Sequence, residues 1–228
     1  MCRAASPDPP LYLPVLKTPK FSMLSIQNLC YHPPATPEAI LKNISFKLED
    51  HQLGLMVGPS GSGKSTLLEI LAGFVEWTSG GIYWKSQELS PDHLQQICGL
   101  VFQFPERHFC GSTILEELRL GHIDLDGDRI QGALSSVGLS QLNPNTSPQS
   151  LSGGQQRRLA LAVQLIRQPS LLLLDEPTAG LDWSMRKQIL SILQELKKDW
   201  TILVVTHEPE ELGSMADQTW MLAHGKIA

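Results

Sequence analysis

Three short stretches of the chain are almost wholly apolar, at positions 53–57, 171–174 and 202–205. A strand of a parallel sheet has this composition because other elements cover both of its faces. Two further stretches, 24–29 and 44–48, mix apolar and polar positions, and the second alternates strictly. Such alternation is typical of a strand with only one face on the core. The pattern therefore predicts a parallel sheet in the core with antiparallel strands beside it.

Helices are predicted in several of the intervening segments. Residues 184–198 carry apolar side chains at helical spacing on one face and end in Lys197 and Lys198. Thr113 and Glu116 have the spacing of a capping box, which starts a helix. The region from about 90 to 150 is rich in such signals and interrupts the strand–helix alternation. We expect it to form an inserted helical subdomain.

Composition restricts the function. The net charge of −5 argues against a protein that binds nucleic acid through general attraction to phosphate. The apolar runs are too short to span a membrane, so any membrane role requires a partner. Residues 1–22 hold five prolines and little apolar periodicity, which predicts a disordered lead-in before one domain at 23–228. An organelle transit peptide is the alternative for this segment.

A glycine-rich segment follows the apolar run at 53–57 and precedes a predicted helix. Glycines allow backbone N–H groups to close around phosphate oxygens, and the helix start adds its positive dipole end. Lys64 would reach the β- and γ-phosphates, and the Ser65 hydroxyl would bind Mg²⁺. The alternative is an ordinary glycine turn. The residues predicted to bind the nucleotide here are Gly58, Pro59, Ser60, Gly61, Ser62, Gly63, Lys64, Ser65 and Thr66.

Two carboxylates end the apolar run at 171–174. A buried parallel strand delivers its last side chains to the sheet edge where ligands bind in such folds. Asp175 would coordinate Mg²⁺, and Glu176 would polarise the water that attacks the γ-phosphate. The alternative is a strand end capped by two acids and Pro177. With the phosphate loop, these residues predict an α/β fold with a P-loop nucleoside-triphosphatase core.

A second segment, Leu151-Ser152-Gly153-Gly154-Gln155, has two compatible interpretations. Ser152 and Gln155 have capping-box spacing and precede an apolar helix. The two glycines would also expose N–H groups that an anion can approach closely. Because the chain already has one phosphate loop, this second grip is expected to serve a nucleotide held by another subunit.

These motifs and their order resemble the ATP-binding cassette (ABC) family over nearly all of residues 24–227. The resemblance identifies residues 151–155 as the signature motif and residues 179–182 as the D-loop. It implies that His207 contacts the γ-phosphate and that Gln103 links Mg²⁺ to the transporter. It also implies that Tyr31 stacks on adenine, where the alternative is a tyrosine at a strand edge. The fold implied is an ABC ATPase with an antiparallel β subdomain and an α-helical subdomain.

The segment from Val101 through Thr113 resembles the ATPase subunits of energy-coupling-factor importers, which take up vitamins or transition-metal ions. Phe104 departs from that pattern, since a polar residue is usual there, and Trp183 replaces a common proline. The chain also resembles a cyanobacterial and chloroplast branch of single-cassette proteins. Both resemblances imply an ATP hydrolase that uses Mg²⁺.

The expected partners are a second cassette, identical or paralogous, and an integral membrane subunit that contacts residues 103–109. No nucleic-acid partner is expected. The protein would lie on the cytoplasmic face of a membrane, or alternatively in the chloroplast stroma or envelope. The rival function is a soluble ABC ATPase in iron–sulfur cluster assembly or another non-transport role.

Overall fold

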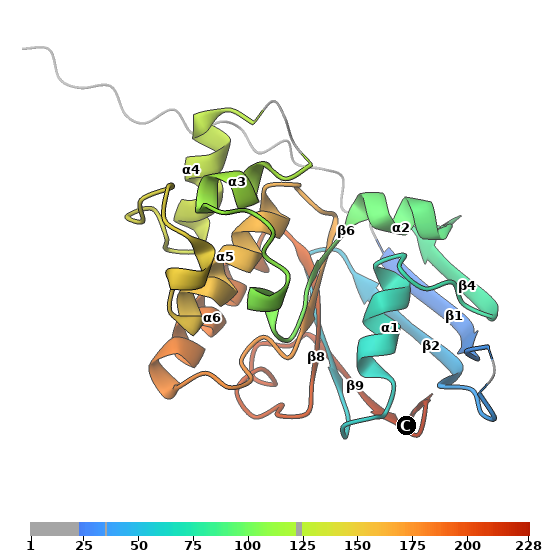
Figure 1. The fold of residues 1–228 in the computed structure, drawn as a ribbon. Helices are drawn as coiled ribbons and strands as arrows, with labels where there is room; N and C mark the ends of the chain where they lie inside the picture. Colours follow the sequence, from blue (N-terminus) through green and yellow to red (C-terminus); the bar gives the residue numbers. More distant parts are fainter. Residues whose placement is uncertain (1–22, 35, 122–124) are drawn as a thin grey trace, which may run out of the picture.

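The computed structural model describes residues 23–34, 36–121 and 125–228. The predicted lead-in at 1–22 lies outside these residues. Within them, no helix is both long and apolar enough to cross a membrane. Two sheets and their helices make up the fold (Figure 1).

The larger sheet has six strands, in the order β10-β9-β3-β8-β7-β6. All neighbouring pairs are parallel except β9 and β10, which pair antiparallel. The apolar runs at 53–57, 171–174 and 202–205 lie in its three central strands, so the predicted parallel core is confirmed. The strands are β3 (Leu53–Val57), β6 (Cys98–Val101), β7 (Leu171–Asp175), β8 (Thr201–Thr206), β9 (Gln218–Ala223) and β10 (Lys226–Ile227).

The smaller sheet has four antiparallel strands in the order β2-β1-β4-β5, which confirms the predicted flanking strands. On β2, Ile44, Phe46 and Leu48 are buried while their neighbours are exposed, as the alternation predicts. The strands are β1 (Met23–Tyr31), β2 (Leu41–Glu49), β4 (Ser79–Trp84) and β5 (Gln87–Glu88).

The helices divide between the two sides of the six-stranded sheet (Figure 1). On one side α1 and α2 lie beside the antiparallel sheet, and on the other α3, α4, α5 and α6 pack together. The helices are α1 (Lys64–Leu71), α2 (Pro91–Ile97), α3 (Ile114–Arg119), α4 (Gly127–Ser136), α5 (Gly153–Leu165) and α6 (Trp183–Leu196). Two short 3-10 helices, η1 (Pro105–Arg107) and η2 (Pro148–Ser150), precede α3 and α5.

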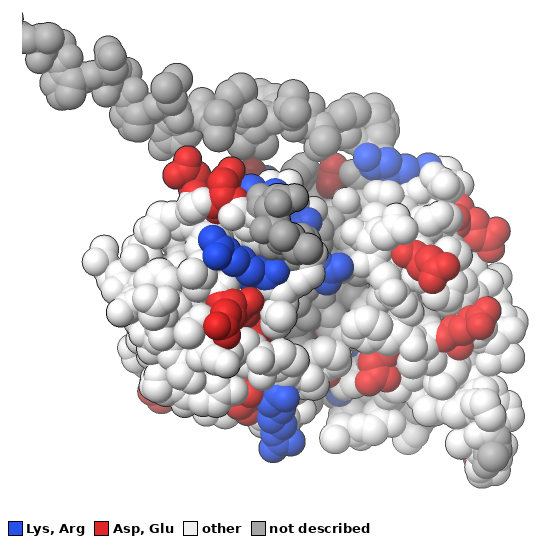
Figure 2. Space-filling model, turned by 45° about the horizontal axis from the view of Figure 1, so that its top comes forward, with Lys and Arg blue, Asp and Glu red and all other residues white. Residues whose placement is uncertain are grey.

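The surface carries charges of both signs. Figure 2 shows basic and acidic side chains close together on one half of this face and scattered over the other half, not a continuous stripe of one sign. That distribution suits a protein whose net charge is −5. A nucleic-acid groove would instead concentrate lysine and arginine along one path.

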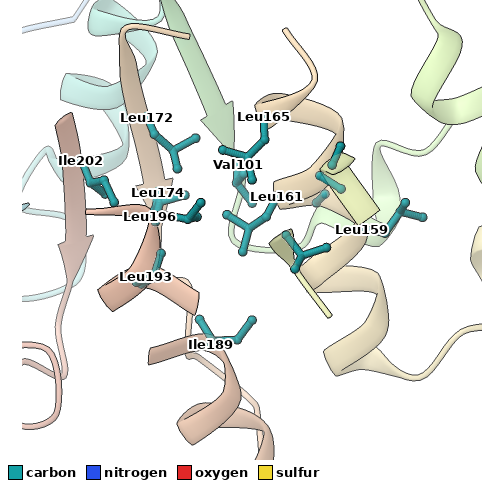
Figure 3. Close-up of a cluster of buried hydrophobic side chains, with 14 of the residues drawn as sticks. Val101, Leu159, Leu161, Leu165, Leu172, Leu174, Ile189, Leu193, Leu196 and Ile202 are labelled. Carbon is teal, nitrogen blue, oxygen red and sulfur yellow. The ribbon is translucent and has the colours of Figure 1, made fainter. Parts of the chain in front are cut away.

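The continuous apolar runs are explained by two separate cores. Alternate residues of each central strand point to opposite sides, so Leu172 and Leu174 pack with α5 and α6 while Leu171 and Leu173 pack with α1 and the antiparallel sheet. Both faces are thus removed from water, which favours an apolar residue at every position. The first core includes Val101, Leu159, Leu161, Leu165, Leu172, Leu174, Ile189, Leu193, Leu196 and Ile202 (Figure 3).

The helical subdomain begins later than the predicted residue 90. Strand β6 lies inside that range but pairs with β7 at the edge of the six-stranded sheet. Only four residues long and containing Gly99, it gives a weak strand signal. Strand β9 was also not predicted, because Gln218 and Thr219 precede its apolar residues and its burial pattern is mixed. Both strands are short or partly exposed, and they lie beside the central strands of the sheet, whose apolar sequences give a stronger signal.

Candidate active site

The phosphate loop spans residues 58–63 between β3 and α1, as predicted. Gly58 donates its N–H to the Thr206 carbonyl at 3.2 Å, and a Cβ there would lie 2.1 Å from the Leu222 carbonyl oxygen. Only glycine therefore fits between the loop and β9. Gly61 has φ +78° and open space where a Cβ would stand. The left-handed conformation explains this glycine, and the open space leaves the backbone accessible to a ligand.

A cavity of about 450 Å³ opens beside this loop. It gathers predicted residues from four separate segments of the chain, which the sheet topology brings together. Ile40, just before β2, also lines it and was not predicted. The lining consists of Ile40, Ser60, Gly61, Gly63, Lys64, Ser65, Thr66, Gln103, Asp175, Glu176 and His207.

Lys64 is held inside this cavity by the loop itself. Its side chain is buried, and Nζ donates to the carbonyl oxygens of Gly58 at 2.8 Å and Pro59 at 3.0 Å. These contacts keep the ammonium at the loop without a carboxylate partner within ion-pair distance among the described residues. The charge is therefore available to an anion in the cavity.

Asp175 ends β7 beside the loop and is almost fully buried. Burial raises the pKa of Asp175, and Glu176 adds to the rise, whereas the Ser65 side chain and the charge of Lys64 oppose it. Asp175 and Ser65 line the same cavity, and a carboxylate and a hydroxyl are oxygen ligands that Mg²⁺ accepts. The described residues form no cluster of three or more histidine, cysteine or acidic ligands.

Glu176 is fixed by donors on both carboxylate oxygens. Oε2 accepts from the Thr206 hydroxyl at 2.8 Å. Oε1 accepts from the His207 backbone N–H at 3.0 Å and lies 2.6 Å from its Nδ1. Glu176 also has φ 48°, a left-handed conformation that is costly for a residue with a Cβ. Strain and orientation of this kind are features of functional sites.

Thr206 therefore has a testable role. Thr206→Val keeps the side-chain shape but removes the hydroxyl that orients Oε2, so we expect about tenfold lower kcat with unchanged nucleotide affinity. Thr201→Val is the matched control, because Thr201 is a buried threonine at the other end of β8 whose hydroxyl bonds Asp50 at 3.1 Å. Steady-state hydrolysis checks both variants. Equal kcat in the two would contradict the role of Thr206.

The segment 151–155 lies outside this cavity. Ser152 caps α5, with its hydroxyl accepting from the Gln155 N–H at 3.3 Å and its own N–H donating to Gln155 Oε1 at 2.9 Å. The capping-box interpretation is thus confirmed. Gly153 faces open space, whereas a Cβ on Gly154 would lie 2.8 Å from Met185 Sδ. Ser152 and Gly153 are exposed, whereas Gly154 is buried. The grip on a second nucleotide stays a prediction.

Tyr31 ends β1 and does not line the cavity. Its ring packs partly against the core shared by the two sheets. Its carbonyl accepts from the N–H of the cavity residue Ile40 at 2.8 Å. Tyr31 therefore contacts a residue of the cavity lining without lining the cavity itself. Its stacking on adenine stays a prediction.

The segment 102–109, which contains Gln103, forms an aromatic surface. Phe102 stacks on His108 with ring centroids 4.4 Å apart, and Phe74 stacks on Phe102 at 6.3 Å. The Arg107 guanidinium lies 4.7 Å from the centroid of the Phe104 ring, which is 42% exposed. Phe74 and Phe104 are the exposed aromatic residues here, so this surface is a candidate for contact with another molecule.

The sequence did not single out Ile40, Thr206 and Arg157 as parts of the site. Thr206 directly precedes the predicted His207, which is the one signal that could have found it. Arg157 is buried on α5 and donates to the backbone carbonyls of Glu176 and Ala179. No local pattern marks a contact between residues that far apart in the chain.

Comparisons with known proteins agree with this geometry. The family model described as "ABC transporter" matches residues 41–179. The chain is 41% identical over 223 residues to the Arabidopsis thaliana protein "ABC transporter I family member 11, chloroplastic", covering 91% of this chain and 80% of that one. It is 34% identical over 216 residues to an energy-coupling factor transporter ATP-binding protein of Clostridium acetobutylicum, covering 87% and 76% respectively.

A solved structure has the same fold. It is cbiO1 from Clostridium perfringens, described as part of the ABC transporter complex cbiONQ. The TM-score is 0.82 at 28% identity, over 90% of this chain and 86% of that one.

Proposed function

This chain belongs to the ABC transporter family, and from that premise we propose that it is the ATP-hydrolysing subunit of a membrane importer. The observation that carries the proposal is the cavity beside the phosphate loop. It combines Lys64 with two carboxylates and His207 at one edge of the sheet. That set can bind a nucleoside triphosphate and activate a water.

ATP binding would use residues 58–66. Backbone N–H groups and the start of α1 would hold the phosphates, with Lys64 on the β- and γ-phosphates. Ser65, Asp175 and Gln103 would hold Mg²⁺, which would neutralise charge on the phosphate oxygens. Tyr31 would stack on the adenine.

Glu176 would act as the general base for the attacking water, since its carboxylate lies in the cavity with Lys64. The contacts from Thr206 and His207 would hold it in place. His207 lies with its Nδ1 2.6 Å from Glu176 Oε1. Its ring would contact the γ-phosphate beside the base and stabilise the developing charge.

We propose that each active site is completed by a second cassette. Ser152, Gly153, Gly154 and Gln155 do not line the cavity of their own chain, yet they form a helix start at which Ser152 and Gly153 are exposed, as an anion site requires. Two cassettes placed head to tail would bring each signature onto the partner's nucleotide. Closure would complete the charged site, and hydrolysis would reopen it.

The membrane subunit would dock on residues 103–109, with the neighbouring Phe74 as part of the same aromatic surface. Gln103 lines the nucleotide cavity and also lies within the segment that forms this surface, so it would report nucleotide state to the transporter. The substrate class would be a vitamin or a transition-metal ion, as in energy-coupling-factor importers. No nucleic-acid partner is proposed.

The protein would lie on the cytoplasmic face of its membrane. The chloroplast relative supports the stroma or envelope as the alternative location. The rival function, iron–sulfur assembly without a membrane partner, remains the one to exclude experimentally.

Purification in gentle detergent tests the proposal. We expect the full-length chain to co-purify with an integral membrane protein, and Phe104→Ser to lower that recovery at least about fivefold because it removes a central apolar contact. Met221→Ser is the matched control, since Met221 is equally exposed on β9. Nucleotide binding by both variants verifies folding. Recovery of a soluble scaffold instead of a membrane protein would contradict the transport role.

A further inference from the structure

Arg157 is a buried cation that the proposed mechanism leaves unused. It lies on α5, two residues after Gln155, and is 5% exposed. Nη1 donates to the Glu176 carbonyl at 2.9 Å, and Nη2 donates to the Ala179 carbonyl at 3.3 Å. Its Nε is buried and finds no acceptor among the described residues. The side chain does not line the nucleotide cavity.

Stability alone does not explain this charge. Burial lowers the pKa of Arg157, and only the charge of Glu106 opposes that effect, with no carboxylate within ion-pair distance among the described residues. An apolar side chain of similar length would fill the same space without the cost of desolvating a guanidinium. A role in fixing conformation is the physical reason that remains for an arginine here.

The two carbonyls that it contacts are the ends of one tight turn. The Glu176 carbonyl also accepts from the Ala179 N–H at 3.1 Å, which closes that turn. Glu176 begins the turn in a left-handed conformation with φ 48°. A strained residue persists only when its surroundings over-determine it. Arg157 supplies two of the bonds that do so, and it supplies them from α5.

Arg157 also sits where three functional elements meet. Its helix begins at the Ser152 cap, and its guanidinium holds the turn that carries the proposed base. The charge of Glu106 also acts on it, and Glu106 belongs to η1, which packs against α5. A rigid helix transmits a shift at its start to a side chain just over one turn away. The link therefore runs from the signature segment, through one guanidinium, to Glu176.

We propose that Arg157 is a positioning residue that couples α5 to the general base of the same chain. When the partner's nucleotide docks on Ser152 and its neighbours, the shift of α5 is passed to the turn at 176–179 and aligns Glu176 at the other active site. This coupling rests on the proposed roles of Glu176 and the signature segment. Beyond those roles, the coupling would let the two active sites of the dimer influence each other.

Arg157→Met in the full-length chain tests the coupling. We expect kcat to fall about tenfold while the KM for Mg-ATP changes less than about twofold, because Arg157 does not touch the nucleotide cavity. The kcat of Arg157→Lys should lie between those of the wild type and Arg157→Met, since one ammonium cannot reproduce the planar fork that spans two carbonyls. Arg129→Met is the matched control, because Arg129 bonds the Ile166 carbonyl at 2.9 Å beyond the other end of α5.

A double-mutant cycle separates positioning from simple loss of structure. If Arg157 acts through Glu176, Arg157→Met should lower the residual single-turnover rate of Glu176→Gln less than about twofold. An equal tenfold loss in both backgrounds would overturn the proposal, as would a wild-type kcat in Arg157→Met. If Glu176→Gln alone hydrolyses ATP normally, the proposed function fails, and that result is distinct from a failure of the coupling.

Discussion

Glu176→Gln should retain ATP binding but lose at least about 100-fold in steady-state hydrolysis, because the amide cannot accept the proton of the attacking water. Glutamine is close to isosteric and keeps one oxygen for the donors that surround this position, Thr206 and His207. Lys64 and the phosphate loop are untouched. The variant should therefore form the closed ATP-bound dimer and stay in it, which size-exclusion chromatography with Mg-ATP will detect.

Glu208→Gln is the control for charge alone. Glu208 follows His207 and lies 3.6 Å from its Nε2, but its side chain is nearly half exposed. We expect its turnover to stay within about threefold of wild type, because exposed charge pairs contribute little. Normal hydrolysis by Glu176→Gln, or an equal loss in Glu208→Gln, would contradict the assignment of the base.

The second large effect concerns the two halves of the shared site. Lys64→Ala removes the cation that the loop holds through Gly58 and Pro59, and we expect at least about 100-fold less hydrolysis through weakened phosphate binding. Ser152→Arg places a bulky cation at the start of α5 and should block docking on the partner's nucleotide. We expect the loss of hydrolysis to be similar in size. Each variant alone is expected to be inactive, for different reasons.

Ser90→Arg controls for the lost helix cap in Ser152→Arg. Ser90 caps α2 with the same reciprocal capping box, formed with His93, so its replacement costs a similar amount of stability, about 1 kcal/mol. It lies outside the cavity and outside the signature segment. Full turnover in Ser90→Arg would assign the loss in Ser152→Arg to the signature itself.

The sequence predicts the centre of the fold better than its edges. Burial on both faces makes the central strands apolar at every position, as at Leu171 through Leu174, and that signal needs no knowledge of neighbours. Strand β6 is short and contains Gly99, so its place in the sheet depends on pairing with β7. Pairing over more than 70 residues leaves no local pattern, and the helical subdomain was therefore predicted to start too early.

The candidate site divides in the same way. Asp175 ends one parallel strand, and Lys64 and His207 lie just after two others, so the sheet brings all three to one edge and the sequence can predict their meeting. Arg157 reaches Glu176 across 19 positions through a helix packed on the sheet. Ile40 enters the cavity from the loop before β2. Such contacts depend on packing between elements, which spacing along the chain does not encode.

Mixing the two inactive variants tests the shared site most directly. A dimer of one Lys64→Ala and one Ser152→Arg subunit has one site with an intact phosphate loop and an intact opposing signature. With random pairing at equal amounts, about half of the dimers are mixed and one of their two sites works, so turnover should recover to about a quarter of wild type if the two sites act independently. If the coupling proposed through Arg157 operates, the recovery should be about tenfold smaller, because the working Glu176 lies in the subunit whose signature is blocked. ATP turnover no higher than the sum of the separate variants would contradict the shared-site account.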